Sequence, residues 1–223
     1  MKLVHPDLRF QIMFHDGMIP VVVVESPVRL RMMLKELLSQ QQGNEGKWIL
    51  CGEDQEFAIN KSVEIILNPL QLEENQKRIM NAFLQSLGKT ATNETYWKRG
   101  QELNDMVQAF FAQLEMEYPF EYHIKSEIDF PTLAKTMGIR INSEFESDLE
   151  RLLQFCILSE NMLNSKVFVF FHLHEYFNDK EITQFYQEVL YRKWNILLVE
   201  SSVRNRISNE KFYIIDEDNC EIY

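Results

Sequence analysis

Glycine is scarce in this chain, because only 7 of the 223 residues are glycine, about half of the roughly 7% that proteins usually contain. The glycines are scattered, so the sequence does not predict a glycine-rich loop that would cradle phosphate. Cysteine is rarer still, and the 3 cysteines lie too far apart for a disulfide framework or a metal-binding pair. The two shortages disfavour nucleotide-binding loops and disulfide-rich folds.

The chain also lacks long hydrophobic runs and an excess of basic residues. No apolar run approaches the length of a membrane span, which is about 18 residues or more, and the N-terminus lacks the segments of a secretory signal. We therefore expect a cytoplasmic protein with no membrane partner. The 34 acidic and 23 basic residues give a formal net charge of −11, which argues against a surface that coats nucleic acid everywhere but permits a local basic patch.

Hydrophobic residues make up 45% of the chain, enough for one full core or for one core with a sizeable insertion. Two almost wholly apolar segments, Lys166–Phe171 and Trp194–Val199, are predicted to be strands, and a helical repeat over Asp179–Tyr191 connects them. Apolar strands joined through a helix are typical of a parallel sheet that is covered on both faces. The predicted fold class is α/β, with a mostly parallel sheet.

Local sequence patterns predict the remaining strands and helices. Leu8–Phe14 and Met18–Val24 flank the turn residues His15, Asp16 and Gly17, which together predict a hairpin. The remaining predicted strands are Lys47–Cys51, Ser62–Leu67, Ile139–Asn142, Phe212–Ile215 and Glu221–Tyr223, and the remaining predicted helices begin at Pro27, Leu72, Glu94, Phe130 and Glu144.

The hydrophobic period changes to a helical one at Asn68-Pro69. After the two long helices comes a short acidic and aromatic stretch, Glu115–Asp129, and then a brief helix that ends at Gly138, a predicted C-cap. We therefore predict two parts. Residues 1–67 and 138–223 form an α/β domain, and residues 68–137 form a helical insertion whose two long helices make a hairpin.

Two motifs leave an enzyme open as an alternative. Lys89 and Thr90 end a sequence like that of a phosphate-binding loop, although Phe83 stands where its first glycine should be and a helix precedes it. His172 and His174, with Glu175 or Glu200, could instead ligate zinc. The alternative function is therefore a small NTPase or a metal-dependent enzyme that acts on nucleic acid.

Charged residues gather in two groups within the predicted insertion. The basic set could contact duplex phosphates without reading bases, or could simply solvate the helices. The acidic cluster could bind a hard cation such as calcium, or could form a solvated acidic face. The basic set is Lys77, Arg78, Lys89, Lys98 and Arg99, and the acidic cluster is Glu115, Glu117, Glu121, Glu127 and Asp129.

The order and spacing of several segments in the C-terminal half carry a family resemblance. The segments are Thr136–Ile141, Phe145-Glu146, Lys166–Phe170, Asn195–Glu200 and Phe212–Asp218. Over about Thr132 to Tyr223 the chain resembles the Csn-two family, which comprises CRISPR-associated adaptation proteins of type II-A systems. The N-terminal part fits this family in pattern, and the helical insertion fits it in length and position.

The resemblance implies a head domain with an NTPase-like α/β fold that lacks nucleotide-binding motifs, and a helical leg. It also implies a homotetrameric ring without catalytic activity, which binds the ends of linear double-stranded DNA in a lysine-lined channel and is stabilised by calcium. The implied role is the acquisition of new spacers, with the integrase proteins and the effector nuclease of the same locus as partners.

The family's acidic run after the long leg helix matches Glu115, Glu117, Glu121 and Glu127 by position, so the resemblance implies that the acidic cluster binds calcium. The channel lysines have no residue-by-residue match. We assign DNA contact to the basic set, since a ring lumen needs basic residues and this is the most segregated basic group. A third reading is an adaptor without DNA affinity, for which the acidic surface would be the docking face.

Overall fold

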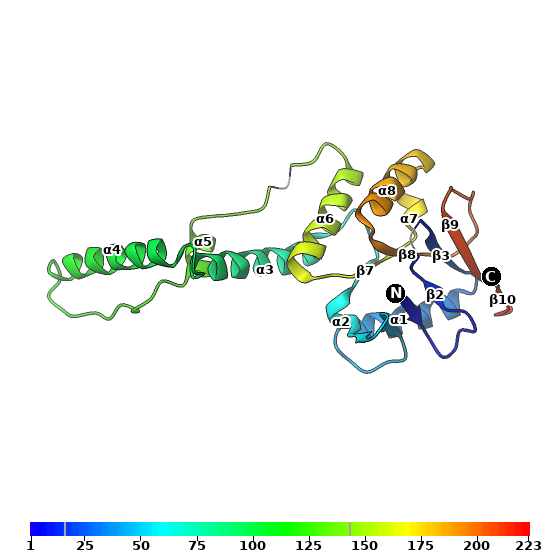
Figure 1. Cartoon of the computed structure of the whole chain (residues 1–223), viewed down its shortest axis with the longest axis horizontal. Helices are drawn as coiled ribbons and strands as arrows, with labels where there is room; N and C mark the ends of the chain where they lie inside the picture. Colours follow the sequence, from blue (N-terminus) through cyan, green and yellow to red (C-terminus); the bar gives the residue numbers. More distant parts are fainter. Residues whose placement is uncertain (16, 143) are drawn as a thin grey trace. The chain divides into compact units, whose positions relative to one another are not determined.

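The computed structural model of the chain describes residues 1–15, 17–142 and 144–223, with their side chains except those of residues 73–75. The chain divides into an α/β unit, residues 1–74 with 144–223, and a helical unit, residues 75–143 (Figure 1). Both boundaries lie a few residues later in the chain than those we predict from the sequence. Among the described helices, none has the length and apolar character needed to cross a membrane.

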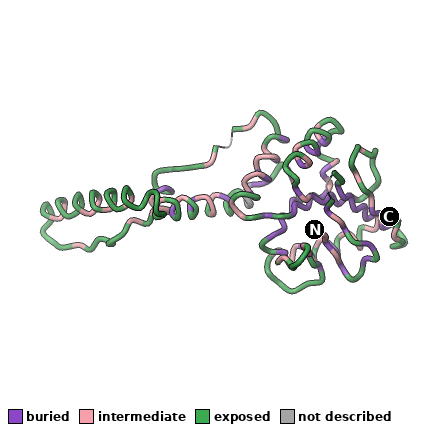
Figure 2. Tube along the Cα trace, viewed as in Figure 1, coloured by how far each residue is buried: buried purple, intermediate pink, exposed green. Residues whose placement is uncertain are grey.

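A six-stranded sheet forms the centre of the α/β unit, in the order β10-β9-β3-β8-β7-β6. All neighbouring strands are parallel except β10, which runs antiparallel to β9. The strands are β3 (Ile19–Val24), β6 (Val63–Ile66), β7 (Val167–Phe171), β8 (Asn195–Glu200), β9 (Glu210–Ile215) and β10 (Glu221–Ile222). Every residue of β3 and β7 is buried (Figure 2), as the apolar runs predict. The predicted α/β class with a mostly parallel sheet is confirmed.

Helices cover this sheet, and alternate residues of β7 show how. Val169 belongs to the core cluster that includes Met33 and Leu37 of α1, whereas the ring of Phe170 packs edge-on against Phe185 of α8 at 5.3 Å between centroids. Side chains of a strand alternate between its two faces, so both faces of β7 are buried against other elements. The helices of this unit are α1 (Pro27–Gln41), α2 (Ile59–Ser62), α6 (Asp148–Leu163), α7 (Leu173–Tyr176) and α8 (Asp179–Arg192).

A second, antiparallel sheet of four short strands has the order β2-β1-β4-β5. Its strands are β1 (Lys2–Val4), β2 (Ile12–Met13), β4 (Ile49–Cys51) and β5 (Glu56–Phe57). The predicted N-terminal hairpin is therefore wrong. β2 pairs with β1, while β3 pairs with β8 and β9, and one bridge between His15 and Met18 joins the two segments. The six buried residues of β3 favour a central place in the large sheet over a two-stranded hairpin.

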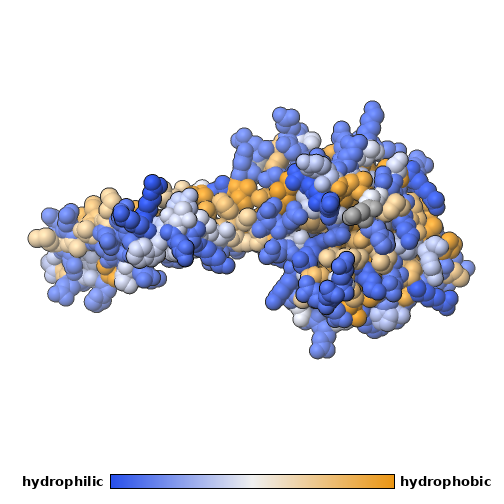
Figure 3. All heavy atoms as spheres, in the orientation of Figure 1, coloured by the Kyte–Doolittle hydropathy of each residue, from blue (hydrophilic) through white to orange (hydrophobic). Residues whose placement is uncertain are grey.

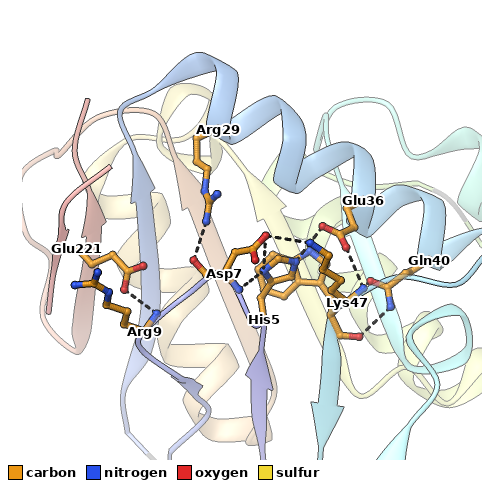
Figure 4. A network of polar contacts seen from close by, with 9 residues as sticks. His5, Asp7, Arg9, Arg29, Glu36, Gln40, Lys47 and Glu221 are labelled. Atoms are coloured by element: carbon orange, nitrogen blue, oxygen red, sulfur yellow. Dashed lines mark hydrogen bonds and ion pairs between the residues drawn. The ribbon is translucent and has the colours of Figure 1, made fainter. Parts of the chain in front are cut away.

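A polar network holds the small sheet to α1 (Figure 4). Buried His5 accepts the N–H of Asp7 at Nδ1, over 3.1 Å, and its Nε2 lies 3.0 Å from a carboxylate oxygen of Glu36. The amide of Gln40 makes two 2.9 Å hydrogen bonds to the backbone of Trp48, one as donor and one as acceptor. These contacts give hydrogen-bond partners to the ring of His5, to the amide of Gln40 and to the backbone of Trp48, as buried polar groups require.

The helical unit contains most of α3 (Glu73–Ala91) together with α4 (Trp97–Glu115) and α5 (Phe130–Thr136). The predicted helical hairpin is wrong, because α3 and α4 lie end to end and residues 116–129, the return segment, run back along α4 (Figure 1). Asn104 fixes this segment by donating to the carbonyl of Ser126 at 3.1 Å and accepting the N–H of Ile128 at 3.0 Å. Gln108 also donates to the carbonyl of Lys125, at 2.5 Å.

Two glycines shape the helix junction, residues 88–100, where α5 also packs. A Cβ atom at Gly88 would lie 2.6 Å from Cγ of Pro131, and one at Gly100 would lie 3.0 Å from the carbonyl oxygen of Ala91. The missing side chains thus permit close approach between α3, α4 and α5. Gly88, which the sequence places in a possible phosphate loop, is a packing residue inside α3.

The predicted strand Ile139–Asn142 is also wrong, because these residues have no regular secondary structure. Gly138 ends α5 in the left-handed region, with φ of 73°, and none of the described strands pairs with the residues that follow. The next helix begins at Asp148 rather than at Glu144, because the side chain of Ser147 accepts the N–H of Glu150 at 3.1 Å and caps it.

Candidate nucleic-acid interface

Charge is distributed unevenly between the two units. Residues 75–143 contain 8 basic and 8 acidic residues, so the net charge of −11 belongs entirely to the α/β unit. The helical unit is itself divided, because residues 75–99 hold 5 basic residues and 1 acidic residue, whereas residues 100–143 hold 3 basic and 7 acidic residues. The first part of the helical unit is therefore the most basic region of comparable length in that unit.

Helix α3 places three members of the basic set in solvent. Lys77, Arg78 and Lys89 are all exposed. Arg78 and Lys89 are 11 residues apart, which puts them on one face of the helix about 16 Å apart along its axis. The buried side chains Ile79 and Leu84 point in other directions.

The other two members, Lys98 and Arg99, lie in the first turn of α4 and are exposed. Asn93 starts this helix, because its side chain accepts the N–H of Tyr96 at 3.0 Å and its carbonyl accepts the N–H of Trp97 at 2.7 Å. The junction thus brings Lys98 and Arg99 near the end of α3 that carries Lys89. Lys77 and Arg78 lie at the other end of α3, about 18 Å away along its axis.

Four of the five basic side chains have unshared charges. Lys77, Lys89, Lys98 and Arg99 make no ion pair with any residue that the structure describes. Exposed and unpaired, these side chains can approach phosphate without first breaking an internal contact, which is the requirement for backbone binding that does not depend on sequence.

The acidic cluster follows α4 but does not converge. Glu115 is the last residue of α4 and accepts the N–H of Tyr122 at 3.2 Å, while Asp129 accepts the hydroxyl of Thr132 at 2.5 Å. Glu117, Glu121, Glu127 and Asp129 are exposed along the return segment. No group of three or more His, Cys, Asp or Glu side chains within the described residues is placed to hold a metal ion. As arranged, the cluster does not fit calcium, which needs about six to eight oxygen ligands.

The first enzyme alternative required a phosphate loop at Lys89 and Thr90. Both residues lie within α3, so their amides belong to the helix rather than to an open loop. Thr92 closes the helix by donating its hydroxyl to the carbonyl of Gly88 at 3.1 Å. A backbone that is still helical presents no cradle of free amides to a phosphate group.

The second enzyme alternative required His172 and His174 as zinc ligands. The side chain of His174 is only 6% exposed, and its Nδ1 and Nε2 lie 2.9 and 3.2 Å from carboxylate oxygens of Glu200 and Glu210. Burial alone would lower the pKa of His174, but the hydrogen bonds to the two carboxylates outweigh it and raise the pKa to about 9. Both ring nitrogens therefore carry protons and are used, and Glu175 pairs with Arg204 at 3.2 Å, so this set presents no zinc site.

Sequence reasoning missed Tyr186 and Glu210, which complete the buried cluster around His174. Tyr186 of α8 donates its hydroxyl to Glu210 at 2.6 Å, and the N–H of Ile207 donates to the same carboxylate at 2.8 Å. Burial would raise the pKa of Glu210, but these donors and His174 lower it instead. The signal available in the sequence was Glu200 at the end of the apolar strand β8 and Glu210 just before the apolar residues of β9, since a buried carboxylate needs a partner.

Comparison with known proteins gives one family. The family model described as CRISPR-associated protein (Cas_Csn2) matches residues 40–219, which includes the whole helical unit. Among solved structures, a putative ABC transporter ATP-binding protein from Pyrococcus furiosus is similar with a TM-score of 0.38 and 11% identity, over 95% of this chain and 97% of that chain. So low a TM-score supports no conclusion about function. No curated protein sequence matches the chain.

Proposed function

Because the chain belongs to the Cas_Csn2 family of CRISPR-associated proteins, we propose that it is a non-enzymatic adaptation protein that forms a homotetrameric ring around linear double-stranded DNA. In this proposal the ring binds DNA ends in a basic channel during spacer acquisition. It acts in the cytoplasm with the integrase proteins and the effector nuclease of the same locus.

The segregated basic set is the observation that supports DNA binding. Lys77, Lys89 and Lys98 are exposed and unpaired within the described residues, in a chain whose net charge is −11. A duplex carries about one charge per 1.7 Å of its axis, so even a few lysines along one channel contribute measurable affinity. None of these residues needs to read a base, and sequence-independent binding follows.

The acidic excess supports a ring rather than an open binding surface. An outer surface with the charge of the α/β unit would repel phosphates that approach from the side. A basic channel inside a closed ring would admit DNA only from a free end. Binding of calcium stays a prediction from the family resemblance, and no step of the proposal depends on it, because the described carboxylates do not converge.

Retention on linear and on closed circular duplexes of one sequence tests the proposal. The DNA would be immobilised and washed at increasing salt concentrations. We expect retention on the linear form alone, with affinity that falls steeply as salt displaces the phosphate contacts. Equal retention on both forms would exclude threading, and a monomeric mass by light scattering would exclude the ring.

A further inference from the structure

The helical unit has a pocket of about 370 Å³ where the return segment leaves α4. Its lining includes Phe111 and Leu114 of α4 and, from the return segment, Tyr118, Phe120 and Tyr122. Phe111, Tyr118 and Phe120 are 41%, 55% and 62% exposed, and Figure 3 shows hydrophobic residues at the surface of the helical unit. Ligand sites usually have volumes of roughly 300–1,000 Å³, so this pocket can hold one side chain or a small ligand.

The aromatic rings of the return segment meet at wide angles. The centroid of the Tyr118 ring lies 5.6 Å from that of Phe120 and 6.4 Å from that of Tyr122, with interplanar angles of 42° and 75°. The rings are therefore not stacked face to face, and the exposed rings of Tyr118 and Phe120 keep faces that a ligand can reach. Such faces carry negative partial charge and attract cations.

Hydrogen bonds inside the helical unit use the donors that border the pocket. The hydroxyl of Tyr122 donates to the carbonyl of Phe111, and its backbone N–H donates to the carboxylate of Glu115 at 3.2 Å. The backbone N–H groups of Glu117 and Tyr118 donate to carbonyls in the last turn of α4 at 3.0 and 3.1 Å. An anion needs free donors, and these four are already occupied.

The charges around the pocket are negative. Residues 111–124 contain three glutamates and no lysine or arginine. Glu117 directly precedes Tyr118, and Glu121 lies between Phe120 and Tyr122. These two glutamates, the acidic rim, are exposed and form no ion pair with any residue that the structure describes. A cation at the pocket would therefore meet ring faces and unpaired carboxylates together.

We propose that this pocket, the aromatic pocket, binds an arginine side chain of a protein partner. The guanidinium group stacks on Tyr118 or Phe120 and pairs with a carboxylate of the acidic rim, while apolar residues beside the arginine contact Leu114. The inference goes beyond the proposed function, because it depends neither on a ring nor on DNA.

The chemistry of the pocket selects this occupant. Exposed aromatic side chains that gather in one place mark contacts with other macromolecules. Arginine suits the aromatic pocket better than lysine does, because its guanidinium is planar and weakly hydrated. It can stack on a ring and still form two hydrogen bonds to one carboxylate. Arginine and tyrosine are also enriched among the residues that contribute most to the affinity of protein interfaces.

Capped tripeptides titrated into the full-length chain test the occupant. The probes are acetyl-Leu-Arg-Leu-amide, the same peptide with glutamine in place of arginine, and ethylguanidinium, all in buffer with a metal chelator. Proton NMR follows the δ-methylene of the peptide arginine, whose resonance shifts upfield when the group lies over a ring face. We expect this shift, and we expect the arginine peptide to bind about tenfold more tightly than the glutamine peptide.

Three outcomes would overturn the proposal. Equal binding of the two peptides would show an apolar pocket that does not select a cation. Ethylguanidinium that binds as tightly as the arginine peptide would assign the pocket to a free small cation. Binding that occurs only at concentrations too low for the chain to associate would assign the pocket to a second copy of the chain.

Leucine substitutions separate the ring faces from the apolar bulk. Tyr118→Leu and Phe120→Leu should each reduce the preference for the arginine peptide about threefold, whereas Tyr118→Phe, which keeps the ring, should preserve it. The control is Tyr191→Leu, because Tyr191 is 82% exposed and belongs to α8. An unchanged preference in both leucine variants would contradict the proposal.

Neutralising the acidic rim tests the charge without disturbing the rings. We expect the double variant Glu117→Gln, Glu121→Gln to bind the arginine peptide about threefold more weakly and the glutamine peptide as before. Glu102→Gln, an exposed change in α4 outside the pocket, is the matched control. Unchanged affinity for the arginine peptide in the double variant would overturn the inference.

DNA retention, measured on the same samples, separates this inference from the proposed function. The rim variant should retain linear DNA as the wild type does. Wild-type protein that binds the arginine peptide but does not retain DNA would overturn only the proposed function. Wild-type protein that retains DNA but does not distinguish the two peptides would overturn only the aromatic pocket.

Discussion

His174 is a single residue on which several elements of the α/β unit depend. It joins Glu200 at the end of β8 to Glu210 at the start of β9, and Tyr186 of α8 shares the second carboxylate. The pKa of His174 lies near 9 instead of near 6.5, so the folded state binds its proton more tightly than the unfolded state does. The resulting stabilisation is complete below the unfolded pKa and is lost as pH rises through about 9.

We predict that His174→Gln lowers the free energy of unfolding by about 3 kcal/mol at about pH 6, since two carboxylates then stay buried without a cation. The wild-type protein should lose stability between about pH 6.5 and pH 10, and the variant should lose less over the same interval. Urea denaturation followed by circular dichroism at both ends of the interval measures this. His15→Gln, at an exposed histidine, is the control, and equal pH dependence in wild type and H174Q would contradict the prediction.

At the scale of elements, the helix junction shows how tertiary packing can override the helix propensity of a single residue. Alanine usually stabilises a helix interior by about 1 kcal/mol relative to glycine. At Gly88, however, the added Cβ would lie 2.6 Å from Pro131, which is far closer than atoms tolerate. The close approach of α5 to α3 therefore decides the residue at this position.

We predict that Gly88→Ala destabilises the helical unit by about 1–3 kcal/mol through overpacking. Adding Pro131→Ala should recover most of the loss, because it removes the atoms that clash. Hydrogen exchange of the α3 and α5 amides measures the effect locally. Ser86→Ala, an exposed change in the same helix, provides the comparison, and a more protected α5 in G88A would show that the contact is not tight.

Patterning predicted individual elements better than it predicted their partners. The apolar runs located β7 and β8, and Ser26-Pro27 located the start of α1, because these signals depend on near neighbours in the chain. The hairpin at residues 8–24 and the strand Ile139–Asn142 failed for the opposite reason. Whether an extended segment joins a sheet depends on which other strands reach it.

For the candidate site, too, local patterns located the residues better than they predicted which elements pack together. The sequence placed the five residues of the basic set in the predicted helical hairpin and its connecting turn, and the structure exposes all five. The helical hairpin that should have gathered them is wrong, since α4 continues from α3 and the return segment packs on α4 instead. Two amphipathic helices do not by themselves specify that they pack on each other, because an extended segment can cover the same face.

At the scale of the whole molecule, the distribution of charge makes DNA binding testable by mutation. We predict that reversing Lys77, Lys89 and Lys98 to Glu weakens retention on linear DNA at least tenfold. It should also reduce the slope of log affinity against log salt by about 0.9 for each phosphate that the protein no longer neutralises. Assembly should persist, because all three side chains are exposed and make no ion pair within the described residues.

The matched control reverses three exposed lysines of the α/β unit, Lys35, Lys61 and Lys180. This variant has the same net charge as the first. Any difference in DNA retention between the two therefore comes from local contacts with DNA and not from the overall charge of the protein. We expect it to retain linear DNA more tightly than the first variant at every salt concentration, as filter binding would show. The reverse order would move the DNA-contacting surface to the α/β unit.

The sequence by itself determined the α/β class, the resemblance to a family, and the separation of a basic stretch from an acidic one. Each of these depends on composition or on residues within a few positions of each other. Only the tertiary structure decided that β3 lies between β8 and β9, that His174 is held between two glutamates, and that α4 continues from α3. These features join residues up to about 190 positions apart, and their energies come from burial and pairing that no local pattern encodes.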